Sequence, residues 1–279
     1  MTIPSPLKSG FGNFLSECFK LNQIIIQNNE STNSYKLEFV DNKFLVGGYN
    51  YSNKYLGDLF FAKVDSDKLI IPSFIKTIKS RIFSGYSSLK EIIIPSSVSE
   101  IESSAFSGCS SLKKIEIPPS VTSIQDSVFD GCKSLISITI PSSVKTIGSS
   151  AFSGCSSLIE ISIPSSVSKI NYSAFFHCSS LKKIEIPSSI SIISGSLFSG
   201  CSSLEEIIIP SSVNKIEGFA FSECTSIKKI IIPSSVSEIE KGAFDKCTSL
   251  KEICIPSTLN SNSNLEEMRI GPNVTVVVH

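Results

Sequence analysis

One spacing governs this sequence: proline returns with a constant 23-residue period over most of the chain. The repeated prolines are Pro72, Pro95, Pro118, Pro141, Pro164, Pro187, Pro210, Pro233 and Pro256. Phenylalanine keeps the same period from Phe83 to Phe244, and cysteine keeps it from Cys109 to Cys247. An internal repeat of this kind decides the architecture before any other feature. The chain is therefore expected to fold as a stack of similar units.

Each unit begins with a short strand. The unit that starts at Phe106 reads FSGCSSLKKIEIPPSVTSIQDSV. Its Leu112, Ile115 and Ile117 form the pattern L-x-x-I-x-I, and the alternation at the last two positions is typical of a strand with one buried face. Pro118 then ends the strand, because proline has no N–H for a ladder and favours a turn.

The second half of the unit returns the chain to its starting side. Val121 and Ile124 predict another brief extended stretch. The recurring Ala-Phe pair, as at Ala105 and Phe106, predicts one helical or 3₁₀ turn, and Gly-Cys-Ser-Ser closes the coil with turn-forming residues. The predicted fold class is therefore an α/β repeat in which β-strands predominate over helical turns.

A single unit buries too few apolar side chains to offset the conformational entropy lost when its backbone is ordered. Stacking supplies the missing burial, because each Ile, Leu and Phe then packs on its copy one coil away, at roughly 4.8 Å. Parallel strands of successive coils share hydrogen bonds. The sequence therefore predicts an elongated right-handed solenoid held by contacts between neighbours.

The chain divides into three regions by this repeat. Residues 69–259 hold eight tandem 23-residue repeats. Residues 1–68 are expected to form a degenerate repeat, a hairpin insertion and a cap, and residues 260–279 a shortened capping repeat. Atypical ends are expected, because an exposed stacking face must be covered.

Each end has its own expected elements. Cys18, Leu21, Ile24 and Ile26 reproduce the repeat spacing, and residues 35–46 predict a β-hairpin with a two-residue turn at Asp41-Asn42. Near the other end, the spacing of Leu265, Met268, Ile270 and Pro272 predicts one more copy of the repeat strand. Residues 274–278 are expected to finish the stack.

The unit L-x-x-I-x-I-P-x-S-V-x-x-I-x-x-x-A-F-x-x-C resembles the BspA-type leucine-rich repeat, closely over residues 69–259 and loosely over 1–26 and 260–279. That family is known from bacterial and protozoan surface proteins. The resemblance implies a solenoid with a concave parallel sheet, and a role in adhesion or in binding host proteins, without a catalytic site. The chain departs from the general leucine-rich pattern, because Ser97, Ser120 and Ser143 stand where that pattern has Asn or Cys.

Charge and hydropathy exclude several classes of protein. The 25 basic and 25 acidic residues cancel, so no basic surface for nucleic acid or anionic lipid is expected. No apolar run approaches the ~20 residues of a membrane-spanning helix. The segment 1–20 also lacks the basic and apolar stretches of a secretory signal.

Few residues are of the types that act as nucleophiles, bases or metal ligands, and no catalytic, cofactor-binding or metal-binding residue is predicted. His177 beside Cys178 suggests a nucleophile and base, but the cysteine belongs to the repeated column. That column is expected to be buried and reduced, with weak S–H donors to carbonyl groups. The alternatives for these cysteines are disulfides and a metal site. The absence of C-x₂-C spacing argues against the metal site.

The strand pattern predicts two outward columns of side chains. The first column is Glu91, Lys114, Ser137, Glu160, Lys183, Glu206, Lys229 and Glu252. Its alternating charges favour cross-strand ion pairing over a recognition stripe.

The second outward column is Ile93, Glu116, Thr139, Ser162, Glu185, Ile208, Ile231 and Cys254. Its last three members predict an exposed apolar patch, rimmed by Glu206, Lys229 and Glu252, and such a patch is typical of a partner site. Together with Lys183, these residues are the candidate partner-binding surface.

These observations favour a non-enzymatic module that binds a protein or glycoprotein, with no nucleic-acid partner and no membrane-spanning segment. The alternative is a structural protein that associates with itself through edges or apolar faces.

Overall fold

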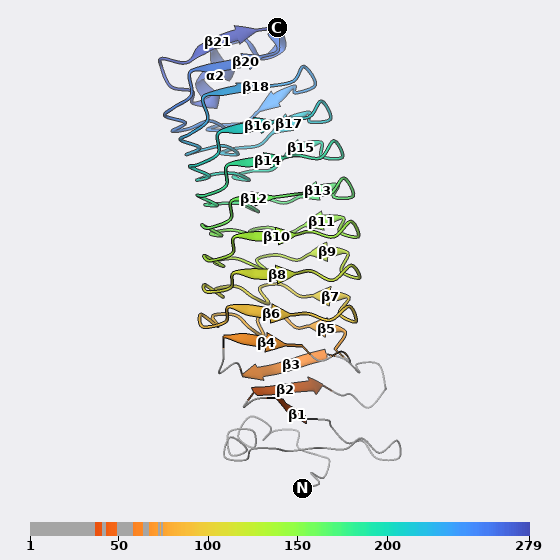
Figure 1. Cartoon of the computed structure of the whole chain (residues 1–279). Coiled ribbons are helices and arrows are strands. Elements are labelled where there is room, and N and C mark those ends of the chain that lie inside the picture. The colour runs from red at the N-terminus through yellow and green to blue at the C-terminus, as the bar shows by residue number, and fades with distance from the viewer. Residues whose placement is uncertain (1–36, 41–42, 49–57, 64–66, 72, 74) are drawn as a thin grey trace.

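The computed structural model describes residues 37–40, 43–48, 58–63, 67–71, 73 and 75–279. Over these residues the chain is a solenoid of stacked coils with parallel strands and little helix, as its repeat predicts (Figure 1). Of the helices in these residues, none has the length and apolar character needed to cross a membrane. The expectations for Cys18, Leu21, Ile24 and Ile26 lie outside the described residues.

The first strand of each coil builds one column along the stack, here called the first strand column. Its members are β4 (Lys68–Ile70), β6 (Glu91–Ile93), β8 (Lys114–Glu116), β10 (Ser137–Thr139), β12 (Glu160–Ile161), β14 (Lys183–Glu185), β16 (Glu206–Ile208), β18 (Lys229–Ile231), β20 (Glu252–Ile255) and β21 (Thr275–Val278). Where neighbouring strands pair, a residue pairs with its copy in the next coil, as Ile115 does with Ile138, so equivalent side chains lie side by side.

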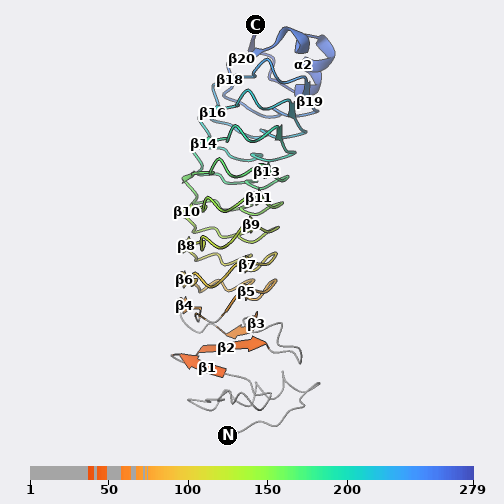
Figure 2. The same cartoon turned by 90° about the vertical axis from the view of Figure 1, so that its right-hand side faces the viewer.

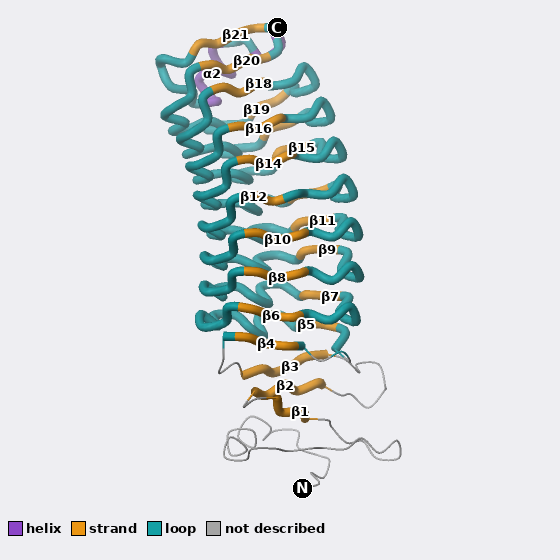
Figure 3. Tube along the Cα trace, in the orientation of Figure 1, coloured by secondary structure: helices purple, strands orange, loops and turns teal. Residues whose placement is uncertain are grey.

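The second extended stretch of each coil builds a second strand column beside the first (Figure 2). Its members are β5 (Thr77–Ile78), β7 (Glu100–Ile101), β9 (Ser123–Ile124), β11 (Thr146–Ile147), β13 (Lys169–Ile170), β15 (Ile192–Ile193), β17 (Lys215–Ile216) and β19 (Glu238–Ile239). The remaining side of each coil consists of turns (Figure 3).

The Ala-Phe segment forms isolated tight turns and no helix: the N–H of Ser107 donates to the Ser104 carbonyl at 3.1 Å, which is the i→i−3 bond of a single 3₁₀-type turn, and the turn does not continue. Ser104 has φ 59° and Gly108 has φ 74°, and such left-handed residues interrupt a right-handed helix. The backbone instead bonds to the next coil: the N–H of Phe106 donates to the Val128 carbonyl at 3.0 Å, and the N–H of Gly108 to the Asp130 carbonyl at 2.7 Å. The turns therefore contribute to stacking as the strands do.

A column of phenylalanines runs through the core. Eight rings, from Phe83 to Phe244, are fully or almost fully buried, and neighbouring rings stack with centroids 5.4–5.8 Å apart. The members of this phenylalanine column are Phe83, Phe106, Phe129, Phe152, Phe175, Phe198, Phe221 and Phe244. The prediction that like side chains lie on like side chains is confirmed.

Cysteine and serine columns satisfy buried carbonyl groups. The Cys109 thiol donates to the Phe83 carbonyl at 3.1 Å, and the same bond recurs in each coil up to Cys247. The seven cysteines of this column are buried and free, as predicted. The serine after each strand acts similarly: the Ser143 hydroxyl donates to the Val121 carbonyl at 2.6 Å. Buried carbonyls need such donors, which explains why serine fits this position.

The predicted hairpin is confirmed at the N-terminal end. Strands β1 (Leu37–Val40) and β2 (Lys43–Gly48) pair antiparallel, and Val40 pairs with Lys43 across the two-residue connection. Strand β3 (Asp58–Lys63) pairs with β2 on one side and, in parallel, with β5 on the other. The hairpin therefore continues the second strand column.

The C-terminal region corrects one expectation. Leu265, Met268, Ile270 and Pro272 predicted a strand, but no strand forms there. After a 3₁₀ helix, η1 (Ser257–Leu259), the α-helix α2 (Asn262–Met268) contains Leu265 and Met268, and Ile270 and Pro272 follow it. The Ser261 side chain caps α2 by accepting the N–H of Asn264 at 3.2 Å. Leu265 and Met268 are three residues apart, a spacing that also places two side chains on one helix face.

The last strand lies where the sequence predicts the stack to finish. Strand β21 pairs in parallel with β20, and Val277 lies beside Cys254. The step from Cys254 to Val277 equals the step from Ile231 to Cys254, although η1 and α2 intervene and the proline spacing breaks. The final coil therefore keeps the register of the repeat.

We predict that Phe152→Ala lowers the free energy of unfolding by about 3–5 kcal/mol, because it leaves a cavity between two stacked rings. Urea denaturation measures the loss. Tyr172→Ala is the control, since that ring is exposed and its removal should change stability by less than about 0.5 kcal/mol. Equal effects of the two variants would contradict a stabilising ring column.

Candidate protein-binding surface

The outer face of the first strand column carries all the side chains that the sequence placed there. Ile115 and its equivalents point into the core, so the flanking residues point outward. Ile93, Glu116, Thr139, Ser162, Glu185, Ile208 and Ile231 are exposed, and so are Lys183, Glu206 and Lys229, whereas Glu252 and Cys254 are partly exposed. The two predicted columns are thus brought together on one face.

The apolar members gather at the C-terminal end of this face. Ile208 is 68% exposed and Ile231 is 55% exposed. Ile231 pairs with Cys254, and Cys254 pairs with Val277, which is 39% exposed. We call these four residues, on β16, β18, β20 and β21, the C-terminal patch. Val277 was missed from the sequence, because the helical segment before it hides the repeat spacing.

A smaller apolar pair lies at the other end of the same face. Ile70 and Ile93 are both exposed, and they are paired neighbours on β4 and β6. Ile70 was also missed, although one repeat step back from Ile93 finds it.

Two shallow hollows lie along this face, one at its N-terminal end, where Ile93 lines it, and one in its middle. Residues of β4, β6 and β8 line an open hollow of about 680 Å³. Residues of β10, β12 and β14 line a second one of about 620 Å³, which includes Thr139, Ser162 and Glu185. The hollows agree with the expected concave sheet and offer a long, shallow surface to a partner.

The charged column forms fewer cross-strand pairs than predicted. Lys229 contacts Glu252 at 2.6 Å between β18 and β20, and Lys68 contacts Glu91 at 2.9 Å between β4 and β6. Lys183 instead turns along its own strand to Glu185 at 3.5 Å. Lys114 and Glu116 make the same kind of contact at 3.0 Å, because side chains two residues apart on a strand share a face.

The Lys229–Glu252 pair borders the C-terminal patch. The hydrogen bond that Lys229 donates to Glu252 lowers the pKa of Glu252 and raises the pKa of Lys229. Both groups are therefore held in their charged, mutually neutralised forms beside Ile231 and Cys254. Of the three rim residues, Lys229 and Glu252 neutralise one another, and Glu206 adds one exposed carboxylate.

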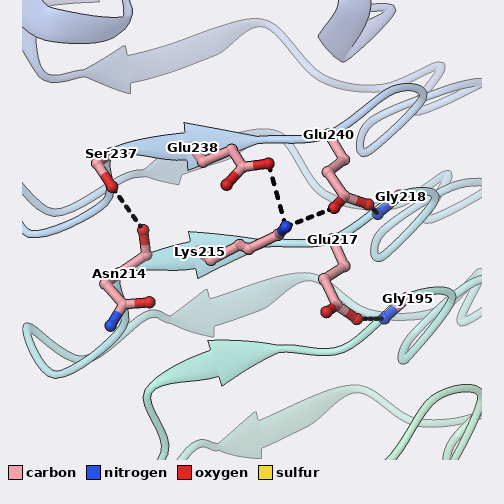
Figure 4. A network of polar contacts seen from close by, with 8 residues as sticks. All are labelled: Gly195, Asn214, Lys215, Glu217, Gly218, Ser237, Glu238 and Glu240. Carbon is pink, nitrogen blue, oxygen red and sulfur yellow. Dashed lines mark hydrogen bonds and ion pairs between the residues drawn. The ribbon is translucent and has the colours of Figure 1, made fainter.

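A second polar network lies on the second strand column (Figure 4). Lys215 contacts Glu240 at 2.7 Å and Glu238 at 3.1 Å. Glu240 also accepts the backbone N–H of Gly218 at 2.9 Å, and Glu217 accepts that of Gly195 at 2.9 Å. These carboxylates complete the hydrogen bonding of the turn in the preceding coil. The network thus connects neighbouring coils, and the charges of Lys215 and Glu240 are used in these contacts.

The structure separates His177 from Cys178. The His177 ring is exposed in a hollow of about 380 Å³, where Glu223 and Lys246 form an ion pair at 2.7 Å. The Cys178 thiol is fully buried on the other side of the turn and donates to the Phe152 carbonyl at 3.2 Å. Burial raises its pKa well above that of a free thiol. The pair therefore lacks the contact that a nucleophile and its base require.

These features define a class of protein. Parallel strands at 23-residue intervals, columns of like side chains and one hollowed strand face make the molecule a leucine-rich-repeat solenoid. The profile described as "BspA type Leucine rich repeat region" matches residues 54–182 and 169–277 in six copies. The chain belongs to the BspA-type leucine-rich repeat family.

Two solved structures show the same fold. A leucine-rich repeat protein from Bacteroides ovatus is 30% identical, with a TM-score of 0.66 over 83% of this chain, which spans 65% of that protein. The leucine-rich repeat protein of T. pallidum is 27% identical, with a TM-score of 0.59 over 73% of this chain and 87% of its own. No curated protein matches the sequence.

We predict a pH-dependent contribution from Glu240. Lys215 and the Gly218 N–H lower its pKa below the usual 4.5. A carboxyl whose pKa is lowered by folding stabilises the fold above its ordinary pKa, and this contribution is lost as the pH falls through the lowered value. The urea midpoint of Glu240→Gln should therefore lie below that of the wild type at pH 7, and the difference should shrink below pH 4.5.

Lys215→Met provides the matched variant. It removes the strongest cause of the lowered Glu240 pKa, so the pH-dependent part of the Glu240→Gln effect should be much smaller in its background. A difference that is independent of pH, or unchanged in that background, would contradict this role for the ion pair.

Proposed function

We propose that the chain is a non-enzymatic binding module whose ligand is a protein or glycoprotein, as in adhesion or the capture of a host or partner protein. The C-terminal patch carries this proposal. Its four side chains lie on four successive strands and form an apolar strip, and exposed strips of this kind often mark protein contact sites.

The solenoid suits such a contact, because it presents the face already ordered. Buried columns of Phe, Ile and Leu fix the strands in register, so little conformational entropy is lost from this side when a partner binds. The hollows along β4–β14 extend the same face toward Ile93. A long partner surface would therefore meet an apolar strip at one end and two shallow hollows of mixed polarity beyond it.

The chemistry of the rim defines the partner further. Lys229 and Glu252 neutralise one another next to Ile231, so the contact is centred on apolar burial and has a polar border. The partner would present aliphatic or aromatic side chains to the patch. Binding of this type should depend only weakly on ionic strength.

We predict that Ile208→Asp combined with Ile231→Asp weakens partner binding by about tenfold or more, as for loss of central interface residues. The thermal transition should change little, because both side chains project from the fold. Binding can be measured against a panel of immobilised extracellular-matrix and cell-surface proteins.

Tyr172→Asp combined with Ile192→Asp is the matched control, because it places the same two charges at exposed apolar side chains that lie off the first strand column. Binding should be retained in this control. Unchanged binding by the patch variant, or an equal loss in both variants, would rule out the patch as the centre of the contact.

A further inference from the structure

The outermost rung of the first strand column is β21 (Figure 1). Its N–H groups toward β20 belong to alternate residues: Thr275 donates to the Lys251 carbonyl at 2.8 Å, and His279 donates to the Ile255 carbonyl at 3.1 Å. Backbone groups alternate in direction along a parallel strand. The N–H and C=O groups of Val276 and Val278 therefore point away from β20, beyond the last coil.

This edge has none of the features that usually prevent strands from pairing. Its sequence is Thr-Val-Val-Val, and Val277 and Val278 are 39% and 42% exposed. A lysine or glutamate occurs in each of β4, β6, β8, β12, β14, β16, β18 and β20. Edge strands normally carry charges, prolines or bulges that discourage pairing with another chain. An uncharged valine edge instead favours it.

We propose that two copies of this chain join end to end through their β21 strands, paired antiparallel about a two-fold axis at Val277. In this register Val276 of each copy lies opposite Val278 of the other. The outward N–H and C=O groups of both valines then exchange bonds, which gives four backbone hydrogen bonds across the axis. Thr275 lies opposite His279, so no two like charges of the strand face each other.

The position of the C-terminal patch explains why a second copy fits this edge better than an unrelated strand. The patch runs through Ile208, Ile231 and Cys254 and ends on β21 at Val277. A two-fold axis at Val277 would bring the patch of the second copy into line with it. The apolar strip would continue across the junction without a charged interruption, which is the self-complementarity that a two-fold interface requires.

Proline substitution tests the edge directly. Proline is tolerated on an edge strand where its nitrogen faces solvent, so Val276→Pro and Val278→Pro should each remove two of the four bonds without breaking the ladder to β20. For the 279-residue chain under reducing conditions, light scattering after size exclusion should show a concentration-dependent rise toward twice 30.2 kDa. Each proline variant should weaken the dimer by about tenfold or more.

Ile208→Asp combined with Ile231→Asp separates this proposal from the proposed function. These residues lie on β16 and β18, away from the edge, so the dimer should persist while partner binding is lost. A single-chain mass at every concentration, or a dimer that both proline variants leave intact, would overturn the edge pairing.

A cysteine at the axis provides a second test that does not depend on proline. Opposed residues of a non-hydrogen-bonded antiparallel pair have Cα atoms about 4.5 Å apart, within disulfide range. Val277→Cys should therefore yield a disulfide-linked dimer on mild oxidation. Val278→Cys is the matched control, because its side chain does not face its own copy in this register. Equal cross-linking of the two variants, or none in Val277→Cys, would refute the two-fold at Val277.

Discussion

The contact between each side chain and its copy one coil away is the interaction on which this molecule depends. A single coil has too little apolar surface to fold alone, but a Phe, Ile or Cys placed on its own kind is buried on both sides. The stacked rings from Phe83 to Phe244 show this most directly. Because the interior is made of columns, a change at one core position acts mainly on the two neighbouring coils.

The same constraint explains which parts of the fold the sequence could predict. Strands, their register and the buried columns all follow from the period, and the structure confirms them from Leu69 to Ile255. One helical or 3₁₀ turn was predicted at Phe106, and a single i→i−3 bond is present there. The pattern does not reveal that Ser104 adopts a left-handed backbone, which prevents a helix. The α2 segment was predicted as a strand, since Leu265-x-x-Met268-x-Ile270 satisfies both patterns and the cap at Ser261 decides between them.

The sequence predicted most of the candidate surface, but it did not predict every residue or contact on it. The outward direction of Ile208 and Ile231 follows from strand alternation, and the structure agrees. Val277 follows Cys254 by one repeat step and could have been added to the column by counting, but the broken proline spacing before it obscured that step. The ion pairs of Lys114 and Lys183 also differ from expectation, since rotamers decide whether a long side chain reaches along its strand or across it. Backbone periodicity thus fixes where side chains emerge and leaves their final contacts to local geometry.

The column of thiols has a consequence for how this chain folds in an oxidising compartment. In the native state, burial raises the pKa of Cys109 and Cys247 to about 12, and it raises that of the thiols between them well above the ordinary value. Thiolate is the reactive form, so the folded column resists oxidation. The unfolded chain has no such protection. Folding would therefore compete in time with disulfide scrambling, and coil-by-coil closure would remove thiols from that competition one after another.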